Sequence, residues 1–431
     1  MHARFVTRRR FLESAGLVVA GSLLAACQST SSPPTTGGAG VPTSAPAAKP
    51  TAAAATTAPA AQAGSGAPVT IGAVMPLTGR YASLAAQVKN GYDLAFDDLN
   101  KNSKIQLQLK VLDDGSDATQ TVQHIESLSA SDNPLAFLGG AGSDLHAAAA
   151  AVADKNKTPY IGVAFALYSV HQRGLKYLFS PFPKSPQLAT AVFDLMDGLS
   201  PKPSKVAIFA EKSDWGGELD GLWQQEAKNR GGYEIVADEQ YTTGATDYSA
   251  LILKAKGNNA DVVLSLPSPP DGMALTKQMK ELDFMPKLAH LIRAPDGLVW
   301  GQNLGKDGDW IVFAPGWHPD MKFPGVPQVV QEHQAKFGKP AEVLVGPAYS
   351  AAQILFDAVN RVGKADRDAL RDALAATNMT TVSGPVKFNP DGTAQVITVM
   401  DQWIGGKQVL IWPKDQASQS IDYPAKPWSG R

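Results

Sequence analysis

Cysteine is nearly absent from this chain of 431 residues, in which Cys27 is the single example. The residues that follow Cys27 therefore offer no thiol, which excludes disulfide bonds and a cysteine nucleophile from that part of the chain. An excess of one charge is missing as well, because 39 Lys and Arg residues stand against 40 Asp and Glu residues. This balance argues against a nucleic-acid partner and against a polybasic membrane patch.

Motifs that carry catalysis or bind metals are also missing. The sequence has no HExxH, CxxC or GxSxG motif, and its His residues are scattered singly. Asp113, Asp114 and Asp117 form an acidic cluster, but their spacing differs from that of an EF-hand calcium loop, and a polar strand end explains them more simply. We therefore expect no catalytic residue, no metal site and no cofactor.

The only long apolar run lies near the N-terminus, from Ala15 to Ala26. It follows TRRRFL at positions 7–12, which matches a twin-arginine export signal, and it is too short to span a membrane comfortably. LAAC at positions 24–27 resembles a lipobox, in which the cysteine thiol is acylated and becomes the first residue of the mature protein. We therefore expect residues 1–26 to be removed and Cys27 to anchor the protein to a membrane outside the cytoplasm.

The segment after the lipobox has a composition unlike that of a folded domain. From Gln28 to Ala67 nearly every residue is Ala, Pro, Thr, Ser or Gly. Such a segment buries too little apolar surface to offset the loss of chain entropy on folding. We expect residues 27–67 to form the lipidated cysteine and a disordered tether, with the globular part beginning at residue 68.

One stretch, residues 134–164, predicts a strand, a glycine loop, a helix and a second strand. The apolar run 135–138 is typical of a strand buried on both faces of a parallel sheet, and Gly139, Gly140 and Gly142 end it. Ser143 and Asp144 then provide N-cap chemistry for an alanine-rich helix, whose free backbone N–H groups would attract an anion. The glycines fit a tight turn without any ligand equally well. No lysine follows the loop and its spacing is not that of a dinucleotide site, so a carboxylate is the anion that it suits.

Strands and helices alternate along the rest of the chain. Strands are predicted at 69–74, 105–111, 206–210, near 235, 262–266 and 288–292. Helices are predicted at about 82–100, 185–199, 218–230, from about 248, and at 273–282, 348–362 and 367–378, and Trp215, Gly216 and Gly217 are expected to form the loop before the helix at 218. A late strand is expected at 396–404, paired with 408–411. Two successive sets of alternating strands and helices, of similar size, predict an α/β protein with two doubly wound lobes.

Several of these segments resemble one family. IGAVMPLTG at 71–79, the glycine loop up to Ser143 and GPVKFNPDG at 384–392 are similar to motifs of type I periplasmic solute-binding proteins for branched-chain amino acids. The resemblance implies two parallel-sheet lobes joined by three crossovers, near 180–184, 313–315 and 393–397. It places residues 68–182 and 314–393 in lobe 1, and residues 183–313 and 394–431 in lobe 2.

The resemblance also implies a ligand site between the lobes. Ser143 and nearby backbone N–H groups would bind a carboxylate, Trp215 would stack on the ligand and Asp296 would pair with a ligand ammonium. The residues that we expect to contact the ligand are Tyr81, Leu84, Gly142, Ser143, Ala164, Phe165, Ala166, Trp215 and Asp296. Ala166 stands where the family often has a Thr, so the pocket is more apolar than usual.

The function that the resemblance implies is the capture of a small carboxylate ligand by lobe closure and its delivery to an ABC permease and ATPase. A hydrophobic amino acid would suit the pocket, and an aromatic or aliphatic organic acid or amide is the alternative. A monomer is expected. Two other classes have less support: a hydrolase would need His and acid partners for Ser143, and a sensor of this fold would normally precede a membrane span and a signalling module, neither of which we expect.

Overall fold

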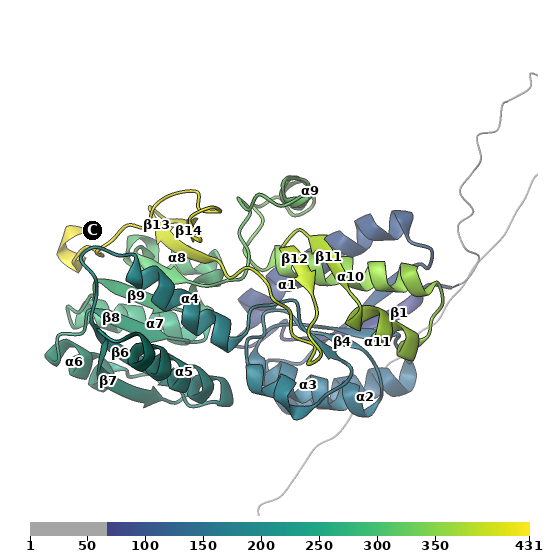
Figure 1. The fold of residues 1–431 in the computed structure, drawn as a ribbon, viewed down its shortest axis with the longest axis horizontal. Coiled ribbons are helices and arrows are strands. Elements are labelled where there is room, and N and C mark those ends of the chain that lie inside the picture. The colour runs from purple at the N-terminus through teal and green to yellow at the C-terminus, as the bar shows by residue number, and fades with distance from the viewer. Residues whose placement is uncertain (1–66) are drawn as a thin grey trace, which may run out of the picture. The chain divides into compact units, whose positions relative to one another are not determined.

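The computed structural model describes residues 67–431 (Figure 1). The predicted export signal, the predicted lipidation site Cys27 and nearly all of the predicted tether lie outside these residues. None of the helices between residues 67 and 431 is both long and apolar enough to cross a membrane.

The first lobe is built on a sheet of five parallel strands in the order β2-β1-β3-β4-β5. Its strands β1 and β3 are largely apolar and buried, as expected for strands covered on both faces. The strands are β1 (Val69–Met75), β2 (Leu107–Asp113), β3 (Ala136–Gly139), β4 (Tyr160–Ile161) and β5 (Leu178–Phe179). Between them lie the helices α1 (Ala82–Leu99), α2 (Ala118–Ser131) and α3 (Ser143–Lys155).

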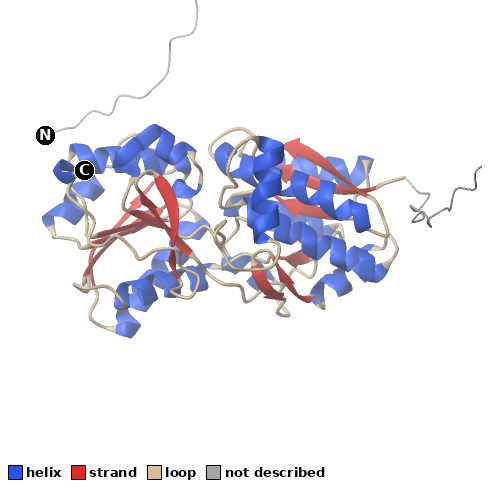
Figure 2. Ribbon diagram, turned by 90° about the horizontal axis from the view of Figure 1, so that it is seen from above, coloured by secondary structure: helices blue, strands red, loops and turns tan. Residues whose placement is uncertain are grey.

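The second lobe contains a sheet of seven strands in the order β14-β13-β10-β9-β8-β6-β7, and Figure 2 shows helices on both of its sides. Its parallel strands are β6 (Lys205–Glu211), β7 (Glu234–Tyr241), β8 (Val262–Ser265), β9 (Leu288–Leu291) and β10 (Ile311–Phe313). An antiparallel pair, β13 (Met400–Ile404) and β14 (Lys407–Trp412), extends the sheet beside β10. The helices of this lobe are α4 (Ser185–Asp197), α5 (Asp214–Arg230), α6 (Ser249–Gly257), α7 (Pro269–Glu281) and α8 (Val299–Leu304).

The chain passes between the lobes three times, after β5, after β10 and before β13. Between the second and third crossings it returns to the first lobe, where α10 (Val345–Val362) packs along α1 and a parallel bridge joins Ser180 to Thr393. This excursion also forms α9 (Val326–Phe337), α11 (Arg367–Ala375) and the hairpin of β11 (Asn378–Thr381) and β12 (Gly384–Lys387). The predicted fold class of two doubly wound lobes with three crossovers is confirmed.

Several elements differ from the sequence prediction. Helix α5 begins at Asp214 rather than near Glu218, because the Ser213 hydroxyl caps it by accepting a hydrogen bond from the Gly216 N–H at 3.1 Å. Gly216 suggested a loop, yet it lies inside the helix, and glycine is required there because a Cβ would lie 1.8 Å from the Glu211 carbonyl oxygen. The predicted strand at 396–404 is shorter and begins at Met400. Elements that the sequence did not predict are α2, α8, α9, β10, β11 and β12.

The acids at the end of β2 hold the turn that precedes α1. The Asp113 carboxylate accepts hydrogen bonds from the Thr78 N–H and hydroxyl, at 3.1 and 2.8 Å. Asp114 accepts from the Thr121 hydroxyl at 2.9 Å, and burial raises its pKa to about 6. These bonds fix the approach of the chain to Tyr81. No group of three or more His, Cys, Asp or Glu residues within 67–431 is arranged to hold a metal ion.

Candidate functional site

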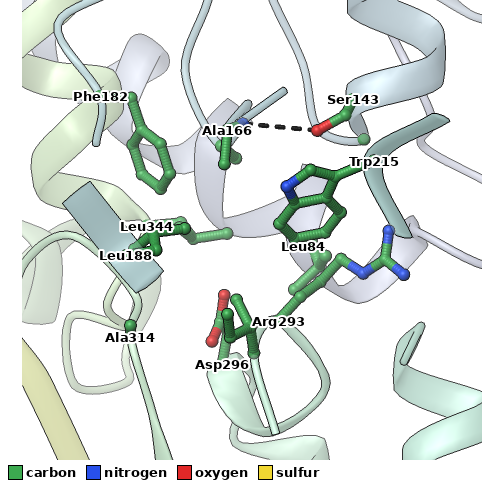
Figure 3. Close-up of a pocket in the computed structure, with 13 residues that line it drawn as sticks. Leu84, Ser143, Ala166, Phe182, Leu188, Trp215, Arg293, Asp296, Ala314 and Leu344 are labelled. Atoms are coloured by element: carbon green, nitrogen blue, oxygen red, sulfur yellow. Dashed lines mark hydrogen bonds between the residues drawn. The ribbon is translucent and has the colours of Figure 1, made fainter. Parts of the chain in front are cut away.

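Residues of both lobes and of the crossovers surround a cavity, which we call the inner cavity (Figure 3). It contains about 390 Å³ of space free of protein atoms, open solvent included. The lining is predominantly apolar, with Ser143, Arg293 and Asp296 as its polar side chains. The lining residues are Leu84, Gly142, Ser143, Ala164, Ala166, Phe182, Leu188, Trp215, Ile292, Arg293, Asp296, Ala314 and Leu344.

The start of α3 forms one edge of this cavity. Gly142 has a φ of +96°, which favours glycine, and a Cβ at this position would lie 2.6 Å from the Tyr81 ring. The sequence had suggested Ser143 as the N-cap of α3, but Ser143 is the first residue of the helix and Gly142 is the N-cap. No side chain within residues 67–431 caps α3. The Ser143 hydroxyl oxygen instead accepts long hydrogen bonds, both 3.4 Å, from the N–H groups of Ala166 and Leu167. Ser143 thus connects the two backbone loops of the first lobe that line the cavity.

Trp215, in the first turn of α5, contributes an aromatic wall from the second lobe. Its indole N–H donates a hydrogen bond of 3.1 Å to the hydroxyl oxygen of Ser185. The Ser185 hydroxyl in turn donates to the carbonyl of Ala166 at 2.9 Å. Ser185 therefore fixes the ring of Trp215 relative to the loop on the other side of the cavity.

Asp296 places a buried carboxyl group at the cavity, and Figure 3 shows this group directed into it. Its Oδ1 atom has no hydrogen-bond partner among residues 67–431. Burial raises the pKa of Asp296 well above its ordinary value, and the nearby Arg293 only partly opposes that shift. The backbone is well held, because the Asp296 carbonyl accepts hydrogen bonds from the side-chain amides of Gln87 and Gln408, at 3.3 and 2.9 Å. A ligand group that donates a hydrogen bond would therefore satisfy a fixed, unpaired oxygen.

Arg293 was not predicted as a site residue. It follows β9 with a φ of +78°, and its guanidinium forms a buried ion pair with Glu211 at 2.5 Å. The same group donates to the Tyr81 hydroxyl at 3.0 Å and to the carbonyl of Leu266 at 2.7 Å. Burial disfavours the cation, but Tyr81 and Glu211 together keep the pKa of Arg293 above its ordinary value. In the sequence, Glu211 is 82 positions and Tyr81 is 212 positions away from Arg293, so no local sequence signal indicates these contacts.

Seven of the nine predicted contact residues line the inner cavity, and two do not. Tyr81 lines an adjoining cavity, where its hydroxyl contacts Arg293. Phe165 is directed away from both cavities, because its ring is stacked between His146 and His171, with centroid distances of 4.9 and 5.6 Å. The ammonium of Lys184 lies 3.9 Å from the centre of the same ring. The sequence also missed the apolar lining residues Phe182, Leu188, Ile292, Ala314 and Leu344.

The chain is similar to curated binding proteins along most of its length. The family model "Periplasmic binding protein" matches residues 68–403. "Leu/Ile/Val-binding protein homolog 8" of Brucella abortus is 26% identical over 373 residues, which cover 81% of this chain and 91% of the relative. Homolog 7 of the same organism is 24% identical and covers 83% of this chain and 94% of its own length.

Solved structures of low sequence identity share the fold. A leucine-binding protein from Thermotoga maritima has a TM-score of 0.74 at 22% identity, with 80% of this chain and 99% of that chain covered. A solute-binding protein from R. palustris in complex with benzoate has a TM-score of 0.73 at 19% identity, with 84% and 100% covered. These structures show that the chain has the type I fold, and the family model, which matches most of the chain, establishes that it belongs to the periplasmic binding proteins and is an extracytoplasmic solute-binding protein.

Proposed function

We propose that this protein captures a hydrophobic amino acid in the inner cavity, closes its two lobes over it and delivers it to the permease and ATPase of an ABC importer. The observation that carries the choice of ligand is the buried Asp296 carboxyl group, whose Oδ1 atom has no hydrogen-bond partner among residues 67–431 and lies at the wall of a predominantly apolar cavity. A ligand ammonium is a group that would complete this arrangement.

The ligand carboxylate is assigned to the start of α3. The first N–H groups of a helix have no intrahelical partner and favour an anion. The Ser143 hydroxyl accepts only long hydrogen bonds, so it remains able to donate to a carboxylate oxygen. In Figure 3 Ser143 and Asp296 come from different elements around the cavity, and we assign to each one of the two charged groups that an amino acid carries on its Cα.

The apolar body of the ligand would contact aliphatic and aromatic side chains. Leu84, Leu188, Ile292 and Leu344 line the cavity together with the ring of Trp215. Burying an aliphatic side chain of this kind contributes roughly 1.5 to 3 kcal/mol to binding before the costs of association. The names of the Brucella relatives, which refer to leucine, isoleucine and valine, support the same ligand class.

A thermal-shift screen of the globular part against amino acids and small organic acids tests the proposal. A ligand at about 100 times its dissociation constant adds about 2.7 kcal/mol to the free energy of unfolding, which raises the melting temperature measurably. We expect leucine, isoleucine, valine or an aromatic amino acid to give the largest shift. A shift with none of the amino acids, at any concentration tried, would contradict the amino-acid assignment.

A plain aromatic or aliphatic carboxylic acid, or an amide, is the second candidate. The raised pKa of Asp296 favours this alternative, because a protonated carboxyl group needs no ammonium and can itself donate a hydrogen bond. The R. palustris structure with benzoate is a second reason to include such acids in the screen. A shift with benzoate or a fatty acid, and none with its α-amino analogue, would decide for this candidate.

The lipid anchor is a separate proposal that depends on the sequence alone, since LAAC at 24–27 lies outside the described residues. We expect a labelled fatty acid to be incorporated into the expressed full-length protein. The label should disappear in Cys27→Ala, and a label that persists in this variant would contradict acylation of this residue.

A further inference from the structure

A second cavity adjoins the first, and we call it the outer cavity. It contains about 680 Å³ of space free of protein atoms, open solvent included, and its walls include Tyr81, Asp144, Glu211 and Asp214. Three residues line both cavities, namely Ser143, Trp215 and Arg293. The two spaces are therefore neighbours that share one wall.

The guanidinium of Arg293 is the centre of that shared wall. It lies 5.0 Å from the ring centre of Trp215 and 5.1 Å from that of Tyr81. It also donates a hydrogen bond to the Tyr81 hydroxyl, so it connects an aromatic ring of the second lobe with one of the first. Figure 3 shows the Arg293 side chain running below the Trp215 ring, with the guanidinium directed away from Asp296. We call the group of Tyr81, Arg293 and Trp215 the partition.

The partition is held firmly. Arg293 is only 7% exposed, and its ion pair with Glu211 is supported by the Thr243 hydroxyl, which donates to the other Glu211 oxygen at 2.8 Å. Carbonyl groups of Leu266 and Pro267 accept from the same guanidinium. A rotation of Arg293 into the outer cavity would leave the Glu211 carboxylate buried without its cation, which is costly.

We infer that Arg293 limits the length of the ligand, and that the outer cavity is a part of the binding site which this side chain closes off. The inference rests on the proposed function, in which the inner cavity binds a hydrophobic amino acid or carboxylic acid. A chain that extends from the inner cavity past Trp215 meets the guanidinium and stops there. Without that side chain the same ligand would continue into the outer cavity.

Two double variants test this inference without leaving a charge unpaired. Glu211→Gln with Arg293→Ala removes both charges and opens the partition, whereas Glu211→Gln with Arg293→Met removes both charges and keeps a long side chain in place. Calorimetric titration uses norvaline, norleucine and longer straight-chain homologues, together with the matching acids that lack the amino group.

The expected result is a change in chain-length preference. In the wild-type protein and in the Met variant, affinity should fall about ten-fold or more once the chain reaches the partition. In the Ala variant the affinity for the longest homologue, relative to norvaline, should rise about ten-fold or more over wild type. An identical chain-length profile in the Ala variant and the wild-type protein would overturn the inference alone. Wild-type protein that binds no member of either series would overturn both the inference and the proposed function.

Tyr81 offers a second test that changes no charge, for the case in which the Ala variant does not fold. Tyr81→Ala removes the first-lobe side of the partition, and Tyr81→Phe keeps the ring while it removes the hydroxyl. We expect Tyr81→Ala to bind the longest homologue better relative to norvaline, and Tyr81→Phe to keep the wild-type profile. Unchanged profiles in both variants would contradict the role of the partition.

Discussion

The two walls of the inner cavity differ in how they present polar groups. The first-lobe wall contains Leu84, the Gly142–Ser143 helix start and the loop with Ala164 and Ala166, and no charged side chain. The second-lobe wall presents Trp215, Arg293 and Asp296, which include every charged side chain of the lining. One wall thus offers backbone groups and apolar surface, and the other offers charge and an aromatic ring.

From this difference we infer that the two lobes recognise different features of the ligand. Backbone N–H groups at a helix start can donate hydrogen bonds to any carboxylate, so we expect the first lobe to recognise a class of ligands. Charged side chains discriminate more strongly, because a buried charge without its partner is expensive. We therefore propose that the second lobe determines which member of the class is bound.

The largest effect is expected for Asp296→Asn, which replaces the carboxyl group of the second-lobe wall with a neutral amide. If the ligand is an amino acid, its ammonium loses its partner, and binding should weaken by about 2 to 5 kcal/mol, or at least thirty-fold. A des-amino analogue should bind as well as before or slightly better. Calorimetric titration of both ligands measures the two effects. Equal losses for the two ligands would show that Asp296 does not act on the ammonium.

A smaller and less selective effect is expected for Ser143→Ala on the first-lobe wall. Loss of a hydrogen bond to a charged group costs roughly 1.5 to 3 kcal/mol, so amino acids and plain carboxylic acids should both bind about ten-fold more weakly or worse. The same pair of titrations measures it. Unchanged affinity for every ligand would remove the helix start from the site and would leave the second-lobe wall as the only source of polar recognition.

A variant of Asp401 would measure how a buried carboxyl group near Asp296 affects the stability of the protein. Neither carboxyl oxygen of this buried residue of β13 has a hydrogen-bond partner within residues 67–431, although Nε2 of His318 lies 4.0 Å from Oδ2. Burial, followed by the nearby Asp296 and Asp320, raises the pKa of Asp401 well above its ordinary value. The folded state therefore keeps a proton that the unfolded state releases near pH 3.9. Its contribution to stability is complete below that pH and is lost as the pH rises through the raised pKa, by about 1.4 kcal/mol per pH unit.

Asp401→Asn should remove this contribution. We expect the free energy of unfolding, measured by urea titration at several pH values from about 4 upward, to fall less steeply with pH in the variant than in the wild-type protein. The difference between the two slopes isolates Asp401, because the other titrating groups are present in both proteins. Parallel curves for the two proteins would show that Asp401 is ionised in the folded state.

The smallest effect is expected for Glu218, which joins the lobes outside the cavity. This residue of α5 accepts hydrogen bonds from the N–H groups of Tyr168 and Ser169, at 2.7 and 2.8 Å, on the first lobe. Glu218→Gln loses one acceptor, which costs about 0.5 to 1.5 kcal/mol, and all ligands should weaken by a similar factor of about two to ten.

Glu226→Gln is the matched control for Glu218, because Glu226 lies on the same helix but contacts Thr190 and Arg230 within the second lobe. Small-angle scattering with and without ligand should show a less complete decrease of the radius of gyration in Glu218→Gln than in the control. Identical scattering of the two variants would exclude a contribution of Glu218 to closure.

Local sequence was sufficient for the first-lobe wall and insufficient for the second. The apolar run before Gly139 and the alanine-rich segment after Ser143 predicted β3 and α3 closely, because strand, turn and helix signals are local. Helix α5 was predicted to begin later than Asp214, because the need for Gly216 arises from a contact with β6. Phe165 was placed in the site by analogy, and its stacking with His146 and His171 could not be inferred from neighbours in the sequence.

The sequence alone determined the α/β class, the two lobes, the helix start at Ser143 and the presence of Asp296 in the cavity lining. These features depend on periodicity, glycine positions and family motifs, which are patterns of residues close together in the sequence. Tertiary structure alone decided that Arg293 lies between Tyr81 and Trp215 and pairs with Glu211. These contacts bring together three separate segments of the chain, around residues 81, 211–215 and 293, and only the folded protein places Tyr81 and Glu211 beside the cation to offset the cost of burying it. The outline of the site was therefore present in the sequence, whereas the side chain that we infer to limit its length emerged from packing.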